Sequence, residues 1–495
     1  MAINNKYFKP LIVPAALVMM GWLSGCKKFL DVPPKDKVSQ TTLLSTEQGF
    51  KDALTGVYLT MDKNSTNGLG NGLYTNDLTM GMVSTLGFEY DNANNTGILG
   101  ESLFSNAVYY YYTQTRVNTE IAAIWGGLYN NIANLNNLLS QIEEKKDIFT
   151  GDSYNRVKGE AIALRALFHF DLARLFGQPP VTGMNEKAIP YITQYKVNPT
   201  QFATLQEALG GCINDLNTAK DLLAQTDTSA VLKATEDPFT SYTQNHLNYW
   251  AVQALLARVY LYKGDLDNAE KYARSVIGAN KFPLITSNVA AAGNVVRDRT
   301  FSQELLFALY SGNIKSYNLN LFNLSSGAGT PLQLTTRRNT IYVAGSGSAA
   351  DYRYTSWFDN SLAGLLVPSK FFQDANLPYL LQNIMPLIRV SEMYYIAAEC
   401  ANRKNDLTTS VVYLNQVRQA RGLNALNASG INTADSVSNE IMREYQKEFI
   451  QEGQTFYYYK RLNKDLRQAT GTTAPDVTGA YVLPVPDKEK EYNNP

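Results

Sequence analysis

This chain of 495 residues has few histidines, few cysteines and no net charge, and each of these absences argues against a class of function. The chain has two histidines and three cysteines, so a histidine-based catalytic triad or a metal site with several histidine ligands is close to excluded. Forty-four basic residues balance 44 acidic ones, which argues against nucleic acid as the main partner. Charged residues make up only 18% of the chain, so we expect a folded protein rather than a disordered one.

Motifs that hold cofactors are also missing. Gly68–Gly72 (GLGNG) approaches a dinucleotide fingerprint, but Leu73 replaces the third glycine and no strand-to-helix context surrounds it. Asp62–Thr66 begins like a calcium loop, but Asn67 replaces the turn glycine and Leu73 replaces the bidentate glutamate. No Gly-Lys-Ser/Thr or Gly-x-Ser-x-Gly motif is present. We therefore predict no cofactor, no metal and no catalytic residue, although spacing alone does not exclude two glycosidase carboxylates that meet in the fold.

The start of the chain predicts a lipoprotein signal peptide. Lys6 and Lys9 precede an apolar segment, Leu11–Gly21, that is too short to cross a bilayer as a stable helix. Leu23–Cys26 (LSGC) matches the bacterial lipobox, after which the chain is cut in front of a diacylated cysteine. We expect residues 1–25 to be removed and Cys26 to carry the lipid anchor. An ordinary secretory signal is the alternative.

Three residues of reactive type are expected to lie in the core. His169 falls inside a helical pattern that is apolar on most sides, so a hydrogen-bonded core histidine is the favoured interpretation. Cys212 and Cys400 lie among apolar residues in two further helical patterns. We expect two buried, unpaired thiols, while sequence leaves open a disulfide between them.

The chain is organised around the stretch Gly159–Pro180 (GEAIALRALFHFDLARLFGQPP). Its apolar residues recur every three or four positions on two adjacent stripes, and Gly177 followed by two prolines ends the pattern. A helix that is apolar around so much of its circumference is surrounded by other helices. Further helices are predicted over Ser45–Met61, with a Ser45/Gln48 capping box, and over Val117–Lys146, Leu205–Leu223, Tyr249–Tyr262, Pro386–Glu399 and Leu407–Arg421.

Small and aromatic residues in Ala254–Ile277 are spaced as in a tetratricopeptide helix pair, with Gly264-Asp265 at the turn. The fold class is therefore all-α, with about four such pairs forming one curved scaffold. Two long irregular regions, Asp62–Thr115 and Lys281–Pro386, show no helical period and are expected to pack on the scaffold as ligand-facing insertions.

Five blocks resemble the SusD/RagB family of outer-membrane nutrient-binding lipoproteins. They are Gly159–Pro180, the start Cys26–Pro34 with its Phe-Leu-Asp, the helix carrying Arg389, Glu392 and Glu399 together with Leu414–Gly422, the segment Glu440–Arg461, and the end Tyr481–Pro486. An Asp351-Tyr-Arg353 triplet also matches an Asp-x-Arg of the family. The blocks occur in the family's order from the lipobox to the last residues. We interpret Arg389, Glu392 and Glu399 as structural ion pairs rather than catalysts.

The resemblance implies a single SusD-like domain over residues 26–495 and a function without catalysis. Such a protein would be anchored in the outer membrane, capture a nutrient, most readily a glycan, and pass it to a partner TonB-dependent (SusC-like) transporter barrel. A lipid-anchored glycoside hydrolase and a scaffold that binds peptides or proteins are the alternatives. A hydrolase would need two carboxylates in its binding cleft.

Sugar rings stack their C–H faces on aromatic rings, while their hydroxyls need polar partners. Tyrosine is abundant, with 32 residues, and both irregular regions carry aromatic and polar groups. If Tyr109–Tyr112 is a strand, Tyr109 and Tyr111 face one side and the other two face the opposite side. The predicted ligand-binding residues are Trp357, Tyr74, Tyr90, Asp77, Tyr109 and Tyr111.

Overall fold

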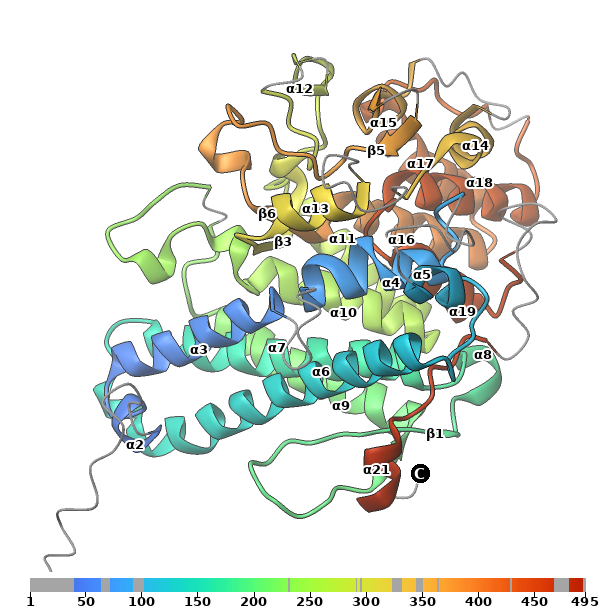
Figure 1. Cartoon of the computed structure of the whole chain (residues 1–495). Helices are drawn as coiled ribbons and strands as arrows, with labels where there is room; N and C mark the ends of the chain where they lie inside the picture. Colours follow the sequence, from blue (N-terminus) through green and yellow to red (C-terminus); the bar gives the residue numbers. More distant parts are fainter. Residues whose placement is uncertain are drawn as a thin grey trace, which may run out of the picture.

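A computed structural model (Figure 1) describes residues 40–63, 72–91, 102–229, 232–290, 292–293, 296–322, 332–343, 350–362, 365–427, 430–466 and 480–492. The signal peptide, Cys26 and the segment up to Ser39 lie outside these residues. None of the helices in the described part of the chain has the length and hydropathy needed to cross a membrane.

Helices make up most of the molecule, as the all-α prediction requires. Successive long helices each pack against the next, so that the chain builds a layered stack. They are α6 (Thr115–Ile142), α7 (Ser153–Phe176), α9 (Leu205–Leu223), α10 (Tyr249–Lys263), α11 (Leu266–Gly278), α16 (Val390–Arg403) and α17 (Leu407–Ala420).

Helix α7 lies inside this stack, between α6 and α9, and almost all of its side chains are buried. This confirms that the stretch Gly159–Pro180 is the central helix. Its end is also as predicted, because Gly177 closes the helix and its N–H donates to the carbonyl of Ala173 (3.0 Å).

The turn between α10 and α11 confirms the tetratricopeptide-like pair. Gly264 has φ +89°, a left-handed conformation that suits glycine. The Asp265 carboxylate then accepts the N–H of Asn268 at 3.1 Å and caps α11. The same arrangement recurs between α16 and α17, where Asn405 has φ +62° and Asp406 caps the next helix. The two helix pairs thus share one local design.

The structure corrects two predicted helix starts. The Ser45/Gln48 capping box does not form, since the Thr46 hydroxyl accepts the Gly49 N–H (3.1 Å) and α3 runs from Glu47 to Met61. The helix expected from Pro386 begins only at Val390, because Ile384–Arg389 is strand β6. This strand pairs antiparallel with β3 (Leu305–Tyr310). An apolar run this short does not distinguish a strand from a buried helical turn.

Residues 72–90 of the first irregular region are not a ligand-facing loop. Residues 72–90 form a π-helical segment, η2 (Leu73–Met80), followed by α4 (Met82–Leu86), and all of them are buried. Some of its polar side chains form hydrogen bonds within the segment; for example, the Thr79 hydroxyl donates to the carbonyl of Tyr74 at 2.9 Å. Internal hydrogen bonding lets a polar sequence without helical period lie in the core.

Shorter elements complete the fold. They are α2 (Gln40–Leu43), α5 (Ser102–Ala107), η3 (Glu143–Ile148), α8 (Pro180–Gly183), β1 (Lys187–Pro190), β2 (Phe202–Thr204), η4 (Pro238–Thr240), η5 (Thr243–Asn245), α12 (Ser287–Ala290), η6 (Ser302–Glu304), α13 (Ile314–Phe322), α14 (Thr335–Arg338), η8 (Asn339–Val343), α15 (Tyr352–Ser356), β4 (Phe358–Leu362), β5 (Leu365–Pro368), η10 (Tyr379–Leu381), α18 (Ala434–Glu448), α19 (Gln454–Leu462) and α21 (Asp487–Tyr492). Buried apolar residues from α3 through Leu483 join one continuous core.

Candidate functional site

Tyr109 and Tyr111 are the two predicted ligand-binding residues that lie at the surface. Their side chains are 37% and 54% exposed. The two rings stack, with centroids 5.6 Å apart and planes 23° from parallel. Their backbone N–H groups both donate to the carbonyl of Asn106, at 3.2 and 3.0 Å, in the turn that follows α5. This stacked pair presents aromatic faces to solvent.

The alternate tyrosines hold this turn in place. Tyr110 has φ +58°, so the segment is a turn and not the strand considered from sequence. The Tyr110 hydroxyl donates to the carbonyl of Leu86 (2.7 Å), and the Tyr112 hydroxyl donates to that of Ala480 (2.5 Å). Tyr109 and Tyr111 are thus the more exposed pair, while the strand on which the sequence-based expectation depended does not form.

Trp357 lies fully buried and cannot stack on a ligand in this structure. Its indole Nε1–H donates to the carbonyl of Arg299 at 2.8 Å, and its ring packs against Phe301 at 5.1 Å. The ammonium group of Lys370 lies 4.0 Å from the ring centroid, a cation–π contact. Trp357 is therefore not a ligand contact as predicted, because partners from other parts of the chain enclose the ring.

Tyr90 and Asp77 are also enclosed. The Tyr90 hydroxyl donates to the carbonyl of Met80 at 2.5 Å, and its ring packs against Phe322. Asp77 hydrogen-bonds with Glu120 on α6, whose own pKa is raised by burial. Both residues stabilise the buried segment around η2 and offer no surface to a sugar.

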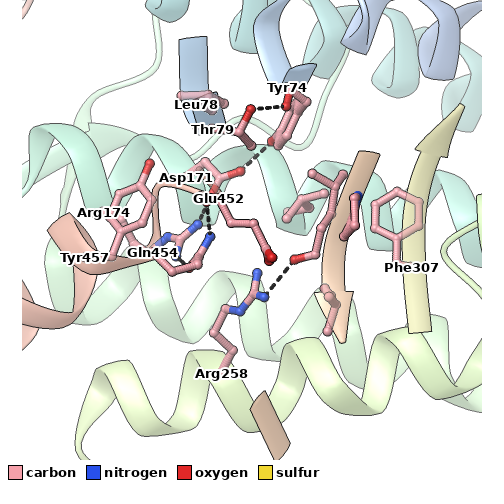
Figure 2. Close-up of a pocket in the computed structure, with 14 residues that line it drawn as sticks. Tyr74, Leu78, Thr79, Asp171, Arg174, Arg258, Phe307, Glu452, Gln454 and Tyr457 are labelled. Carbon is pink, nitrogen blue, oxygen red and sulfur yellow. Dashed lines mark hydrogen bonds and ion pairs between the residues drawn. The ribbon is translucent and has the colours of Figure 1, made fainter. Parts of the chain in front are cut away.

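Tyr74 lines a polar cavity at the centre of the molecule (Figure 2). Its hydroxyl donates to Asp171 on α7 at 2.5 Å, and Asp171 also pairs with Arg174. The Arg174 guanidinium lies 3.7 Å from the ring centroid of Tyr457. On the opposite side of the cavity, Arg258 donates to the carbonyl of Leu387 (2.9 Å) and pairs with Glu392. The cavity thus joins η2, α7, α10 and β6.

This central cavity is too small for a glycan. Its volume is about 20 Å³, which is room for about one water molecule. The charged groups around it neutralise one another within the protein. We therefore interpret the cavity as a structural polar centre.

The residues of the family-like blocks form a buried ion-pair network, which we call the arginine hub. Its members share complete or near-complete burial and mutual contacts of 3.1 Å or less. They are Arg353, Arg389, Arg421, Lys370, Asp351, Glu304, Glu444, Glu448 and Glu452. Glu392 and Glu399 lie outside the hub and pair with Arg258 and Arg461. The prediction that these family residues make structural ion pairs is confirmed.

Two carboxylates of the hub, those of Glu444 and Glu448, are held ionised. Burial works to raise the pKa of Glu444, but Arg353, Lys447 and Arg418 outweigh it and lower this pKa to about 2. Burial likewise opposes ionisation of Glu448, and the neighbouring guanidinium groups hold its pKa well below its usual value. Acids in this state cannot donate a proton to a glycosidic oxygen, which is the task of a hydrolase acid.

The reactive-type residues are inert, as predicted. His169 accepts the N–H of Ile192 at Nε2 (2.9 Å) and therefore donates from Nδ1 to the carbonyl of Arg165 (2.9 Å). Burial lowers its pKa to about 3, so the ring stays neutral. Cys212 and Cys400 are buried and unpaired, which settles the disulfide that sequence left open. Burial raises the pKa of both thiols.

A surface groove with a volume of about 440 Å³ lies between α6, α7 and residues 193–196. It contains one carboxylate, that of Glu143. This group pairs with Lys158 and accepts a hydrogen bond from the Tyr154 hydroxyl at 2.8 Å. Among its lining residues there is no second carboxylate to complete a glycosidase pair.

Sequence reasoning missed three exposed tyrosines. Among the residues whose exposure is described, Tyr195, Tyr310 and Tyr379 join the Tyr109–Tyr111 pair as the aromatic side chains more than about a third exposed. Tyr195 lies on the groove and the other two lie together near the β3–β6 sheet. Lone tyrosines beside proline or at a strand end carry no pattern that marks exposure.

Comparisons with known proteins agree on one family. A family model described as "Starch-binding associating with outer membrane" matches residues 28–261, and the SusD family model matches residues 351–493. SusD-like protein P2 of Formosa agariphila is 24% identical, with 97% of each chain covered. SusD-like protein P38 of the same organism is 22% identical, with 93% of this chain and 92% of that protein covered.

Solved structures share the fold. A SusD-like carbohydrate binding protein from Bacteroides vulgatus superposes with a TM-score of 0.69 at 18% identity, covering 90% of this chain and 96% of that one. Surface glycan-binding protein A from Bacteroides fluxus superposes with a TM-score of 0.65 at 16% identity, covering 91% of this chain and 97% of that one.

Proposed function

The chain belongs to the SusD/RagB family, and from this premise we propose that it captures a glycan at the outer membrane without cleaving it and passes it to a TonB-dependent transporter barrel. Family membership supports the class of ligand, since solved proteins of this fold include ones named as carbohydrate-binding and glycan-binding. The fold alone does not carry function, so the proposal also rests on a surface feature.

The stacked Tyr109–Tyr111 pair is the observation that carries the proposal. Two nearly parallel rings, fixed by the anchored tyrosines between and after them, give a platform that needs little ordering when a ligand arrives. Their outward faces suit the C–H face of a pyranose ring. We propose this pair, from the original set of candidates, as the ligand contact.

Capture without catalysis is supported by the state of the acids. The carboxylates of the arginine hub are buried and paired, and the open groove has a single carboxylate. A lipid anchor at Cys26 would keep the protein beside a transporter barrel. Gentle detergent extraction and pull-down should then recover this barrel with the protein, whereas recovery of the chain alone from cells grown on the inducing nutrient would count against delivery.

Calorimetric titration with neutral hexasaccharides tests the ligand contact. Replacing Tyr111 with alanine should weaken binding at this platform by about two- to twelvefold, because one aromatic contact is worth about 0.5–1.5 kcal/mol. The matched control is Tyr195→Ala, which removes an equally exposed ring from a different surface. Unchanged affinity at every site in both variants would reject the pair as the contact.

A further inference from the structure

Exposed aromatic side chains gather at a second place, distinct from the Tyr109–Tyr111 pair. Tyr310 ends β3 and Tyr379 begins η10, and their side chains are 46% and 70% exposed. Together with Tyr242 they line a hollow of about 30 Å³. In Figure 1 the strands β3 and β6 lie well to the left of α5, which precedes the stacked pair. We call this feature the sheet-end hollow.

The sheet-end hollow is built on a fixed backbone. Tyr310 pairs with Ile384 in the antiparallel ladder of β3 and β6. Asn383 lies between the lining residues Gln382 and Ile384 and has φ +61°. Its Nδ2 donates to the Tyr310 hydroxyl at 3.1 Å. The carbonyl of the same residue accepts the Ser311 N–H at 2.8 Å. The Tyr310 ring is therefore held in position before any ligand binds.

Side-chain amides supply the polar part of the lining. Gln244 and Asn245 come from η5, and Gln382 follows η10. The Oδ1 atom of Asn245 is buried and accepts no hydrogen bond from the described residues. An acceptor in this state favours a ligand that brings a hydroxyl donor. Leu380 and Ile384 complete the lining, which contains no Asp, Glu, Lys, Arg or His.

This combination matches one ligand chemistry. Tyrosine faces take the apolar face of a sugar ring, and amides take its hydroxyls. An acidic sugar would find no counter-charge here, and leaving a charge uncompensated is costly. The hollow admits a hydroxyl or hydroxymethyl group but not a ring. A sugar would therefore lie across Tyr379 with one substituent inserted.

We propose that the sheet-end hollow is a second binding site, specific for neutral glycans and separate from the Tyr109–Tyr111 platform. Proline-rich peptides also dock on aromatic residues, but they need a groove that accommodates several residues in extended conformation. Eight residues at one end of a two-stranded sheet bound this hollow. Two platforms on one protein would hold a polysaccharide at two points and raise its overall affinity.

The test removes the Tyr109–Tyr111 platform by substitution and measures the binding that remains at the sheet-end hollow. The Tyr109→Ala/Tyr111→Ala protein is titrated with hexasaccharides of glucose, mannose, xylose or galactose, and with oligogalacturonate. At least one neutral hexasaccharide should bind, and further substitution Tyr379→Ala should weaken it about tenfold, which is about 1.4 kcal/mol. Tyr195→Ala is the control, and melting temperatures verify that each variant is folded. Oligogalacturonate should not bind.

Each remaining outcome has a definite meaning. The proposal is overturned if the double variant binds no neutral hexasaccharide, if its binding survives Tyr379→Ala, or if a proline-rich peptide binds there instead. Wild-type binding that is lost entirely in the Tyr109→Ala/Tyr111→Ala protein upholds the first platform and rejects the second. Binding that depends on Tyr379 alone upholds the sheet-end hollow and rejects the Tyr109–Tyr111 platform. Failure of one proposal is therefore distinguishable from failure of the other.

Discussion

Arg421 holds Glu304 with both ends of its guanidinium group, since the Nη1–Oε1 and Nη2–Oε2 distances are both 2.7 Å. Both side chains are fully buried. Glu304 precedes strand β3 and Arg421 follows helix α17, so the pair ties the sheet to the helical stack. The Glu304 Oε1 atom also accepts the N–H of Ile285 at 2.8 Å. The pair therefore ties Ile285 and strand β3, both in the second irregular region, to the helical stack.

Breaking this pair should destabilise the whole fold. Arg421→Met removes the bidentate partner of Glu304, which then keeps only Arg389, at 3.9 Å, among the described basic residues, and one of the three arginines that contact Glu448. Breaking a buried ion pair in this way costs about 3–5 kcal/mol. Urea denaturation should show this loss, whereas Arg443→Met, which removes a half-exposed surface partner of Glu440, should change stability by less than about 1 kcal/mol. Wild-type stability in Arg421→Met would contradict a structural role for the arginine hub.

Trp357 should matter for stability and not for binding. Trp357→Ala removes a fully buried ring and should cost about 3–5 kcal/mol of unfolding free energy. Below its lowered melting temperature, the variant should bind hexasaccharides as the wild type does. Tyr111→Ala should behave oppositely, with weaker binding and an unchanged melting temperature. A Trp357→Ala protein with wild-type stability that no longer binds hexasaccharides would contradict this and make Trp357 a ligand contact.

Glu89 should make stability fall as pH rises. Burial raises its pKa from 4.5 to about 7 in the folded chain, despite the hydrogen bond from the Gln451 N–H. Between these two values the folded chain binds more protons than the unfolded chain, so stability is fully present below pH 4.5 and is lost up to about pH 7.

Glu89→Gln should remove this slope. By linkage the loss in the wild type amounts to about 3 kcal/mol, and denaturation at a series of pH values between 4.5 and 8 measures it. Glu207→Gln is the control, because the pKa of that surface acid is lowered by hydrogen bonds from Thr204 and its titration lies outside the window. Parallel stability curves for wild type and Glu89→Gln would contradict the assignment.

Cys26 should carry the lipid anchor. Metabolic labelling with a palmitate analogue should tag the protein, and Cys26→Ala should abolish the tag because the lipobox then lacks its acylated thiol. Cys400→Ser serves as a control, since a buried free thiol elsewhere should not take the label. A tag that survives Cys26→Ala would contradict the lipoprotein interpretation.

The helical part of the fold follows from local sequence. Periodic apolar residues identified α7, and Gly264-Asp265 identified the turn between α10 and α11, because helix spacing and turn chemistry act over a few residues. Strands β3 and β6 could not be found in this way. Leu305–Tyr310 is a short apolar run whose partner lies some eighty residues later, and pairing over such a distance leaves no local signal.

The ligand surface was harder to predict than the fold. The aromatic content of the irregular regions made Trp357 and Tyr74 candidate ligand contacts. Whether these side chains are exposed depends on residues elsewhere in the chain, such as Lys370 and Asp171. Tyr109 and Tyr111 are exposed because Tyr110 and Tyr112 anchor a turn, and the strand considered from sequence does not form. Tyr379 was missed because a lone tyrosine after proline resembles any loop residue.

The central claim, intact capture of a glycan, is tested most directly by recovering the ligand after binding. The purified protein is equilibrated with a neutral hexasaccharide that it binds, and the oligosaccharide is then released and analysed by mass spectrometry alongside an assay for reducing ends. The account predicts saturable binding with all hexasaccharide recovered at its original mass. Shorter products that accumulate with time, and disappear when one carboxylate is replaced, would contradict it and identify the protein as a hydrolase.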